Sequence, residues 1–220
     1  MRSSFRFIVL VGAIVSGAGY AQNGEITATI TDTQGRPLAD AVVVAVPSDG
    51  SLRVVAKPRD DAIFQVDKEF VPKVTPVLVG TAVAFPNNDT VRHHVYSFSP
   101  AKKFELPLYQ GVPAKPVMFD QPGVVVLGCN IHDWMVAYIY VSESPHFAKT
   151  GDDGKATISD LPPRAYTVRA WHAQLEEREQ QIRKPVDVVK ARRSEVAWSL
   201  KLKPEVLVRR APASKHSSHY

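Results

Sequence analysis

Short runs of Val, Ile, Thr, Tyr and Phe, each interrupted by proline or glycine, recur along almost the whole chain. The first two runs, residues 26–31 and 41–46, are separated by the turn-like sequence DTQGRP. Helical periodicity is nearly absent, and the single candidate for a short helix, residues 175–183, is strongly polar. The 17 prolines fit this pattern, because proline is confined to edges and loops of sheets. The chain is therefore predicted to be all-β, as a sandwich or a Greek-key barrel.

Further strands are predicted along the rest of the chain, with residues 47–61 as a polar connection between the first two and the next ones. The expected strands are residues 64–70, 74–79, 81–85, 94–97, 124–128, 136–141, 156–158, 166–171, 186–189 and 196–202.

The N-terminus predicts a secretory signal peptide at residues 1–21. Arg2 and Arg6 precede an apolar stretch, and the small residues Gly19 and Ala21 suit cleavage after Ala21. A membrane anchor is the less favoured interpretation, since the apolar stretch is well short of the ~20 residues that span a bilayer. We expect a protein exported to the periplasm, with no stable membrane insertion after cleavage.

Charge is distributed unevenly over the chain, whose formal net charge is +5. Residues 183–220 carry ten Lys or Arg and three Asp or Glu, whereas acidic residues outnumber basic ones in residues 22–182. Residues 207–220 have too little apolar content to pack on a core, and we predict a disordered basic tail there. This basic end is either a solvated strand and tail or a contact for an acidic partner or membrane surface. No nucleic-acid-binding motif is present, so nucleic acid is not an expected partner.

The only cysteine of the chain, Cys129, precedes His132 by three residues, and Met135 follows after three more. A lone cysteine cannot form an internal disulfide, so it is a buried residue, a free thiol or a ligand. Thiolate and thioether are soft ligands and imidazole is borderline, a combination that suits copper. A Cys–His nucleophile is the weaker alternative, because no third orienting group is apparent.

A second imidazole is expected from the sequence FPNNDTVRHHVYSFS, residues 85–99, in which His93 and His94 open a predicted strand. Neighbouring residues on a strand face opposite sides, so only one of these two can point at a buried metal. Taken singly, each candidate also has an ordinary structural interpretation: a buried thiol, a core methionine or a polar loop.

The two motifs together resemble the cupredoxins, which are plastocyanin-like electron-transfer proteins, over residues 62–142. The combination of HHVYS with GCNIHDWM is similar to secreted plastocyanin-like proteins often labelled methylamine-utilisation proteins. The resemblance implies one type 1 copper per chain, bound by His93, Cys129, His132 and Met135. It also implies an electron carrier rather than an enzyme, with redox proteins as partners. The His132 imidazole would then be the exposed edge of the site, where electrons enter or leave. Two points stay open. One is whether Met135 binds the metal, given the short gap from His132 to Met135, and the other is whether His93 or His94 is the ligand.

Three apolar residues are expected to form the wall of such a site: Phe85, Leu127 and Trp134. Trp134 stands between the second imidazole and the methionine, and its position in the sequence fits an exposed or a buried ring equally well.

The segments on either side, residues 24–46 and 150–172, resemble the early and late parts of a carboxypeptidase-regulatory-like, transthyretin-like sandwich. The predicted domain organisation is therefore a Greek-key cupredoxin sandwich, residues 62–142, inserted in or sharing strands with a second β-sandwich, residues 22–61 and 143–206. Two other functions stay open: a copper carrier or buffer, and a secreted carbohydrate- or partner-binding module with incidental copper.

Overall fold

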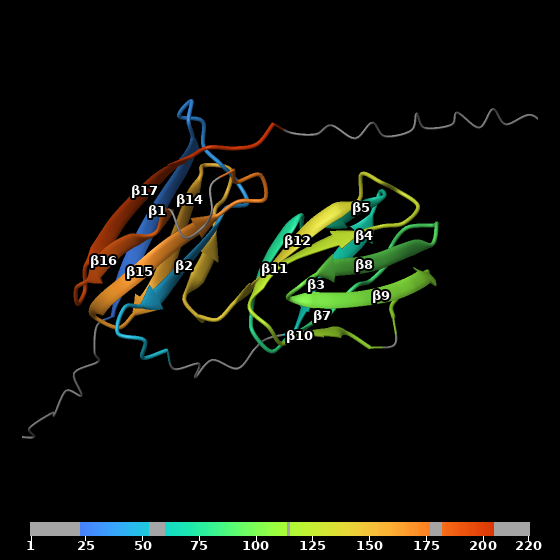
Figure 1. Ribbon diagram of the computed structural model, residues 1–220, viewed down its shortest axis with the longest axis horizontal. Helices are drawn as coiled ribbons and strands as arrows, with labels where there is room; N and C mark the ends of the chain where they lie inside the picture. Colours follow the sequence, from blue (N-terminus) through green and yellow to red (C-terminus); the bar gives the residue numbers. More distant parts are fainter. Residues whose placement is uncertain (1–22, 53–59, 114, 177–181, 205–220) are drawn as a thin grey trace, which may run out of the picture.

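The computed structural model describes residues 23–52, 60–113, 115–176 and 182–204 (Figure 1). Within these ranges the regular secondary structure is β, with no α-helix, which confirms the predicted all-β class. None of these residues forms a helix long and apolar enough to cross a membrane. The predicted signal peptide, the predicted basic tail and most of the candidate helix at residues 175–183 lie outside the described residues.

Two facing sheets form the first group of strands, drawn at the left of Figure 1. In one sheet β1 (Gly24–Asp32) lies between β14 (Lys155–Leu161), which is antiparallel to it, and β17 (Arg193–Leu200), which is parallel. The other sheet has the order β13 (Phe147–Lys149), β2 (Val42–Pro47), β15 (Arg164–Trp171) and β16 (Lys184–Val188). Alternate residues of β1 are buried, as expected for a strand with one face on a core. Of these, Ile26, Ala28 and Ile30 join Tyr166 and Trp198 in one apolar cluster.

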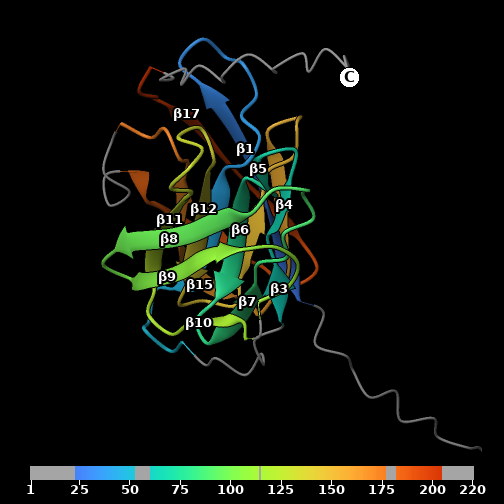
Figure 2. The same ribbon diagram turned by 90° about the vertical axis from the view of Figure 1, so that its right-hand side faces the viewer.

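The second group of strands contains a five-stranded sheet, visible with β8 and β9 towards the viewer in Figure 2. Its order is β6 (Val74–Leu78), β12 (Val136–Ser142), β11 (Gly123–Gly128), β8 (His93–Ser99) and β9 (Lys102–Tyr109), and only the β6–β12 pair is parallel. A three-stranded sheet is formed by β10 (Val117–Phe119), β7 (Thr81–Ala84) and β3 (Asp61–Ala62). A hairpin of β4 (Phe64–Val66) and β5 (Glu69–Val71) completes the group. The core of this group includes Cys129 and Met135.

The second group is interposed in the chain between β2 and β13 of the first group. Among the described residues no strand belongs to sheets of both groups. The domain boundaries given above remain a prediction.

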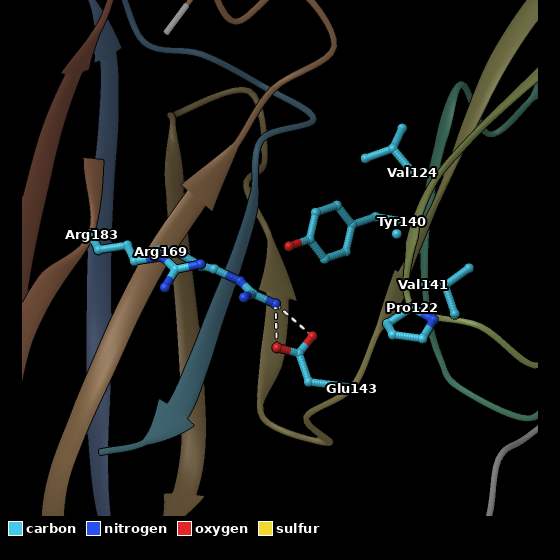
Figure 3. A pocket seen from close by; sticks show the side chains of 8 residues that line it. Pro122, Val124, Tyr140, Val141, Glu143, Arg169 and Arg183 are labelled. Carbon is cyan, nitrogen blue, oxygen red and sulfur yellow. Dashed lines mark hydrogen bonds and ion pairs between the residues drawn. The ribbon is translucent and has the colours of Figure 1, made fainter. Parts of the chain in front are cut away.

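Aromatic side chains join the two groups. Trp171 of β15 lies with its ring centroid 5.8 Å from that of Tyr138 and 5.6 Å from that of Tyr140, both on β12. Val42, Val44 and Val74 pack in the same cluster. Beside it, Figure 3 shows the Tyr140 ring above the ion pair in which Arg169 Nη2 lies 2.5 and 2.6 Å from the Glu143 carboxylate oxygens. Apolar packing and one bidentate ion pair therefore hold the groups together.

The predicted strand at residues 64–70 is wrong, because the structure divides it into β4 and β5. Asp67 and Lys68 have φ values of 53° and 60°, in the left-handed region, and Val66 pairs with Glu69. Two consecutive left-handed residues make the tight turn that suits the twist of a hairpin. Four strands were also not predicted, namely β3, β9, β10 and β13. β9 is an edge strand that carries three charged residues and a proline, and the other three are only two or three residues long.

Candidate metal centre

Three potential ligand atoms converge at one end of the second group of strands. His93 begins β8, Cys129 directly follows β11, and His132 lies in the loop that leads to β12. Cys129 Sγ is 3.9 Å from His93 Nδ1 and 3.9 Å from His132 Nδ1, and all three atoms lie within 4.8 Å of one another. His93 and Cys129 are buried, and His132 is partly exposed. The structure therefore brings together three of the four predicted ligands.

The sheet places Cys129 through its neighbour Gly128. Gly128 pairs with Tyr96 on β8 and with Val136 on β12. A Cβ atom at residue 128 would lie 2.8 Å from Cζ of Tyr96, closer than real Cβ contacts allow. The outer end of the tyrosine ring therefore packs directly against the backbone next to the thiol, and a side chain at residue 128 would push that ring aside.

Asp89 holds the far side of the His93 ring. Its Oδ2 lies 2.6 Å from His93 Nε2 and also accepts the Lys68 N–H at 2.9 Å, while its Oδ1 accepts the Asp67 N–H at 2.6 Å. Burial acts to raise the pKa of Asp89, but hydrogen bonds from the Lys68 backbone and His93 outweigh it and hold the pKa below its usual value. An ionised carboxylate only accepts hydrogen bonds, so Nε2 carries the proton and the Nδ1 lone pair faces the thiol.

Asn87 fixes the loop that presents Asp89 and His93. Its side-chain amide donates to the carbonyls of Val91 at 2.9 Å and Tyr109 at 2.8 Å, and its Oδ1 accepts the Asp89 N–H at 3.0 Å. No role for Asn87 or Asp89 at this site was predicted from the sequence. The spacing of four residues from Asp89 to His93 is the signal that was available for the carboxylate.

His94 points away from the thiol. Its Nε2 lies 3.0 Å from Glu105 Oε1 on β9, and its ring centroid is 5.4 Å from that of Tyr96. The register of β8 against β9 shifts between His93 and Val95, and the extra residue lies on β9, since a step of two residues on β8 corresponds to three on β9. His93 is therefore the histidine that the structure brings to Cys129.

Trp134 covers His132. The two ring centroids are 5.1 Å apart, and Trp134 Nε1–H donates to the Lys68 carbonyl at 3.1 Å. Trp134 is partly buried, between the two positions that its sequence context allowed. Desolvation, with the charges of His93 and Lys68, lowers the pKa of His132. A lowered pKa favours the neutral imidazole, which is the form that binds metal ions.

Met135 is 1% exposed and belongs to the same apolar cluster as Cys129, Phe85 and Leu127. Its backbone N–H donates to the His132 carbonyl at 2.9 Å, which closes the loop before β12 begins. Burial beside the thiol agrees with a core residue as well as with a ligand, so its thioether stays a predicted ligand.

The residues present fit a single metal ion. Zinc bonds of about 2.0 Å to nitrogen and about 2.3 Å to sulfur place the ligand atoms of one tetrahedral ion roughly 3.6 Å apart. The observed 3.9 Å separations exceed this spacing by only a few tenths of an ångström. One thiolate, two imidazoles and a nearby thioether form a donor set that copper tolerates and zinc sites seldom use.

Comparison with known proteins gives similarities of fold only over part of the chain. No family model matches the sequence, and no curated protein matches it. Among solved structures, the chain is similar to a purple cupredoxin from Nitrosopumilus maritimus, with 25% identity over 38% of this chain and 100% of the other and a TM-score of 0.34. It is also similar to a copper-containing nitrite reductase from Thermus scotoductus SA-01, with 24% identity over 53% of this chain and 28% of the other and a TM-score of 0.37.

A third similarity is to amicyanin, in the structure of a mutant with Cu(I). The identity is 16% over 47% of this chain and 99% of the other, with a TM-score of 0.35.

Proposed function

We propose that this chain is an exported blue-copper protein that carries single electrons between redox partners in the periplasm. The observation that supports it is the convergence of Cys129 Sγ, His93 Nδ1 and His132 Nδ1 within 4.8 Å, at the edge of an apolar core. Copper bound there supplies a one-electron couple, Cu(I)/Cu(II), that none of these side chains provides. We propose one type 1 copper per chain, with Met135 as the axial ligand.

The residues around the site suit electron transfer because they restrict movement of the ligands. His93 begins β8 and Cys129 directly follows β11 of the same sheet, and Asp89 keeps the first imidazole in a single orientation. Ligands held in this way rearrange little when the charge of the ion changes, which keeps the reorganisation cost small. The apolar cluster that contains Phe85 and Leu127 excludes water from the buried side of the thiolate.

His132 is the ligand through which we propose that electrons enter and leave. His93 is fully buried and Cys129 is 3% exposed, whereas His132 is partly exposed and adjoins the exposed Ile131. A redox protein that docks at this end of the sandwich approaches the His132 ring more closely than any other ligand. We propose no enzymatic reaction for this chain.

The experiment is to load the purified, leaderless protein with Cu(II) and record its visible spectrum and metal content. We expect one copper per chain and an intense absorption in red light from the Cu(II)–thiolate bond, which disappears on reduction and returns on reoxidation. Cys129→Ser is the matched control, since it removes the thiolate and retains a side chain of similar size. A loaded protein that stays colourless under oxidant indicates a copper carrier instead, and a protein that binds no copper disproves the proposal.

A further inference from the structure

The hairpin turn at Asp67 and Lys68 contacts the two residues that hold the imidazoles in place. These are Asp89, which bonds to His93, and Trp134, which covers His132. The turn joins β4 to β5, and both of its residues have left-handed backbone conformations. Its peptide groups face two different side chains of the candidate metal centre, on two loops that are far apart in the sequence.

On one side, the turn fixes the carboxylate that orients His93. The backbone N–H groups of Asp67 and Lys68 donate to the two oxygens of Asp89, at 2.6 and 2.9 Å. Asp89 Oδ2 in turn lies 2.6 Å from His93 Nε2. A carboxylate held by two backbone donors has little freedom to rotate, so the imidazole bound to it is also restrained.

On the other side, the same turn fixes the ring that covers His132. The Lys68 carbonyl accepts the indole N–H of Trp134 at 3.1 Å, and the Trp134 ring packs 5.1 Å from that of His132. The backbone N–H of Lys68 thus bonds to Asp89, which holds His93, and its backbone C=O bonds to Trp134, which covers His132.

Buried contacts of β4 and β5 hold the hairpin in place, so the turn between them has little freedom to move. Gln65 on β4 is fully buried, and its side-chain amide donates to the Phe85 carbonyl at 3.1 Å. The Gln65 backbone bonds to Pro86 and to Asn88 at 2.9 Å each. Phe70 on β5 is 3% exposed and lies in the same core cluster as Cys129.

We propose that the backbone of the Asp67–Lys68 turn is the positioning element of the copper site, which sets the orientation of both imidazoles together. This inference rests on the proposed copper function but concerns residues that do not themselves bind the metal. Loss of the turn conformation releases Asp89 and Trp134 at once, and both imidazoles then gain freedom. The Lys68 side chain plays no part in this role.

Two substitutions at one position separate the backbone from the side chain. Lys68→Gly removes the side chain, keeps the N–H group and readily adopts φ near the observed 60°. Lys68→Pro also removes the side chain, but it lacks an N–H group, and its ring holds φ near about −65°. Any difference between the two variants therefore reports on the backbone of the turn.

Two measurements read out the effect. The first is the proton position on the His93 ring, from nitrogen-15 NMR of the copper-free protein, which needs no metal. The second is the rate at which a chelator removes copper from the loaded protein. We expect wild-type behaviour for Lys68→Gly. For Lys68→Pro we expect loss of the single Nε2–H form and copper loss about 10–100-fold faster, the range seen when partners of metal ligands are removed.

Equal behaviour of the two variants, whether both match the wild type or both lose copper faster, overturns the proposal. If Lys68→Pro fails to fold, Trp134→Phe decides, because it retains an aromatic ring over His132 and removes, with part of the indole, the N–H that bonds to Lys68. Several-fold faster copper loss in Trp134→Phe then supports the proposal, and an unchanged rate overturns it. A wild-type protein without a Cu(II)–thiolate band disproves the copper function, while the NMR comparison still tests the turn.

Discussion

Asp89 Oδ2 lies 2.6 Å from Nε2 of His93, and the other ring nitrogen of His93 faces Cys129 Sγ at 3.9 Å. The carboxylate and the thiol therefore lie on opposite sides of one buried imidazole. This arrangement selects the tautomer whose free nitrogen points at the thiol, before any metal arrives.

Replacing Asp89 by alanine is expected to weaken copper binding. Asp89→Ala removes the acceptor for His93 and for two backbone N–H groups, and we expect a loss of about 10–100-fold in affinity. Asp89→Asn keeps one acceptor oxygen and is expected to lose less. Competition titration with a chelator measures both values, and wild-type affinity in Asp89→Ala would falsify the assigned role.

Met135→Leu tests whether the thioether binds the metal. The exchange nearly conserves volume, so it should cost less than about 1.5 kcal/mol in unfolding free energy although the site is fully buried. Losing an axial donor destabilises Cu(II) more than Cu(I), and we expect a higher reduction potential in a redox titration. Met118→Leu, at an exposed position on β10, is the matched control. An unchanged potential in Met135→Leu means that Met135 is a core residue only.

Gly128→Ala is expected to disturb the thiol through Tyr96. The new Cβ would lie 2.8 Å from Tyr96 Cζ and 2.9 Å from its hydroxyl oxygen. The partly exposed ring can turn aside, so we expect a cost of about 1 kcal/mol, at the low end for overpacking. The Cu(II)–thiolate band should also shift, because Cys129 is the next residue.

A double variant and a control complete this test. Adding Tyr96→Ala to Gly128→Ala removes the clash and should restore the band position. Gly151→Ala, where the nearest atom is 3.5 Å away, should change nothing. A Gly128→Ala protein with wild-type stability and spectrum contradicts the contact.

Trp171→Ala is expected to loosen the packing between the two groups of strands without altering the candidate metal centre. The ring of this residue contacts Tyr138 and Tyr140. Truncation of a partly buried tryptophan should cost about 2–3 kcal/mol, measured by denaturant unfolding. The copper spectrum should stay unchanged, because Tyr140 pairs with Val124 whereas the thiol follows Gly128 at the other end of β11. A shifted spectrum in Trp171→Ala, with Trp171→Phe as control, contradicts this separation.

Stability should fall at mildly acidic pH because of His172. Burial is the main cause that lowers the pKa of His172, and His172 Nδ1 accepts the Gln174 N–H at 3.2 Å. The unfolded chain, with a histidine pKa of about 6.5, then binds a proton more readily than the folded one. The contribution is fully present above that pH and is lost as the pH falls towards the lower folded pKa.

The measurement is the unfolding free energy of wild type and His172→Gln from pH 8 to pH 5. We expect the wild type to lose more stability than the variant over this range. Burial lowers the pKa of His146 in the same direction, so the variant should retain part of the slope. Identical slopes in the two proteins contradict the prediction.

Several features were accessible from the sequence alone. Alternating apolar residues with proline and glycine between them predict strands wherever one face packs on a core, and β1 shows this alternation residue by residue. The spacing of Cys129, His132 and Met135 also predicted a donor set, because residue types carry their own coordination chemistry. The hairpin at residues 64–71 was missed because neither of its two left-handed residues is glycine, so no turn signal separates the strands at 64–66 and 69–71.

The sequence by itself therefore determined the all-β class and the kinds of ligand atom available. Tertiary structure decided which of them meet. Alternation along a strand allows either His93 or His94 to face the core, and in the folded chain His93 lies on the same side as the buried Val95 and reaches the thiol. The contacts of the Lys68 peptide groups with Asp89 and Trp134 likewise depend on strands that are distant in the chain. Such contacts form only when folding brings separate segments together, so local sequence patterns do not predict them.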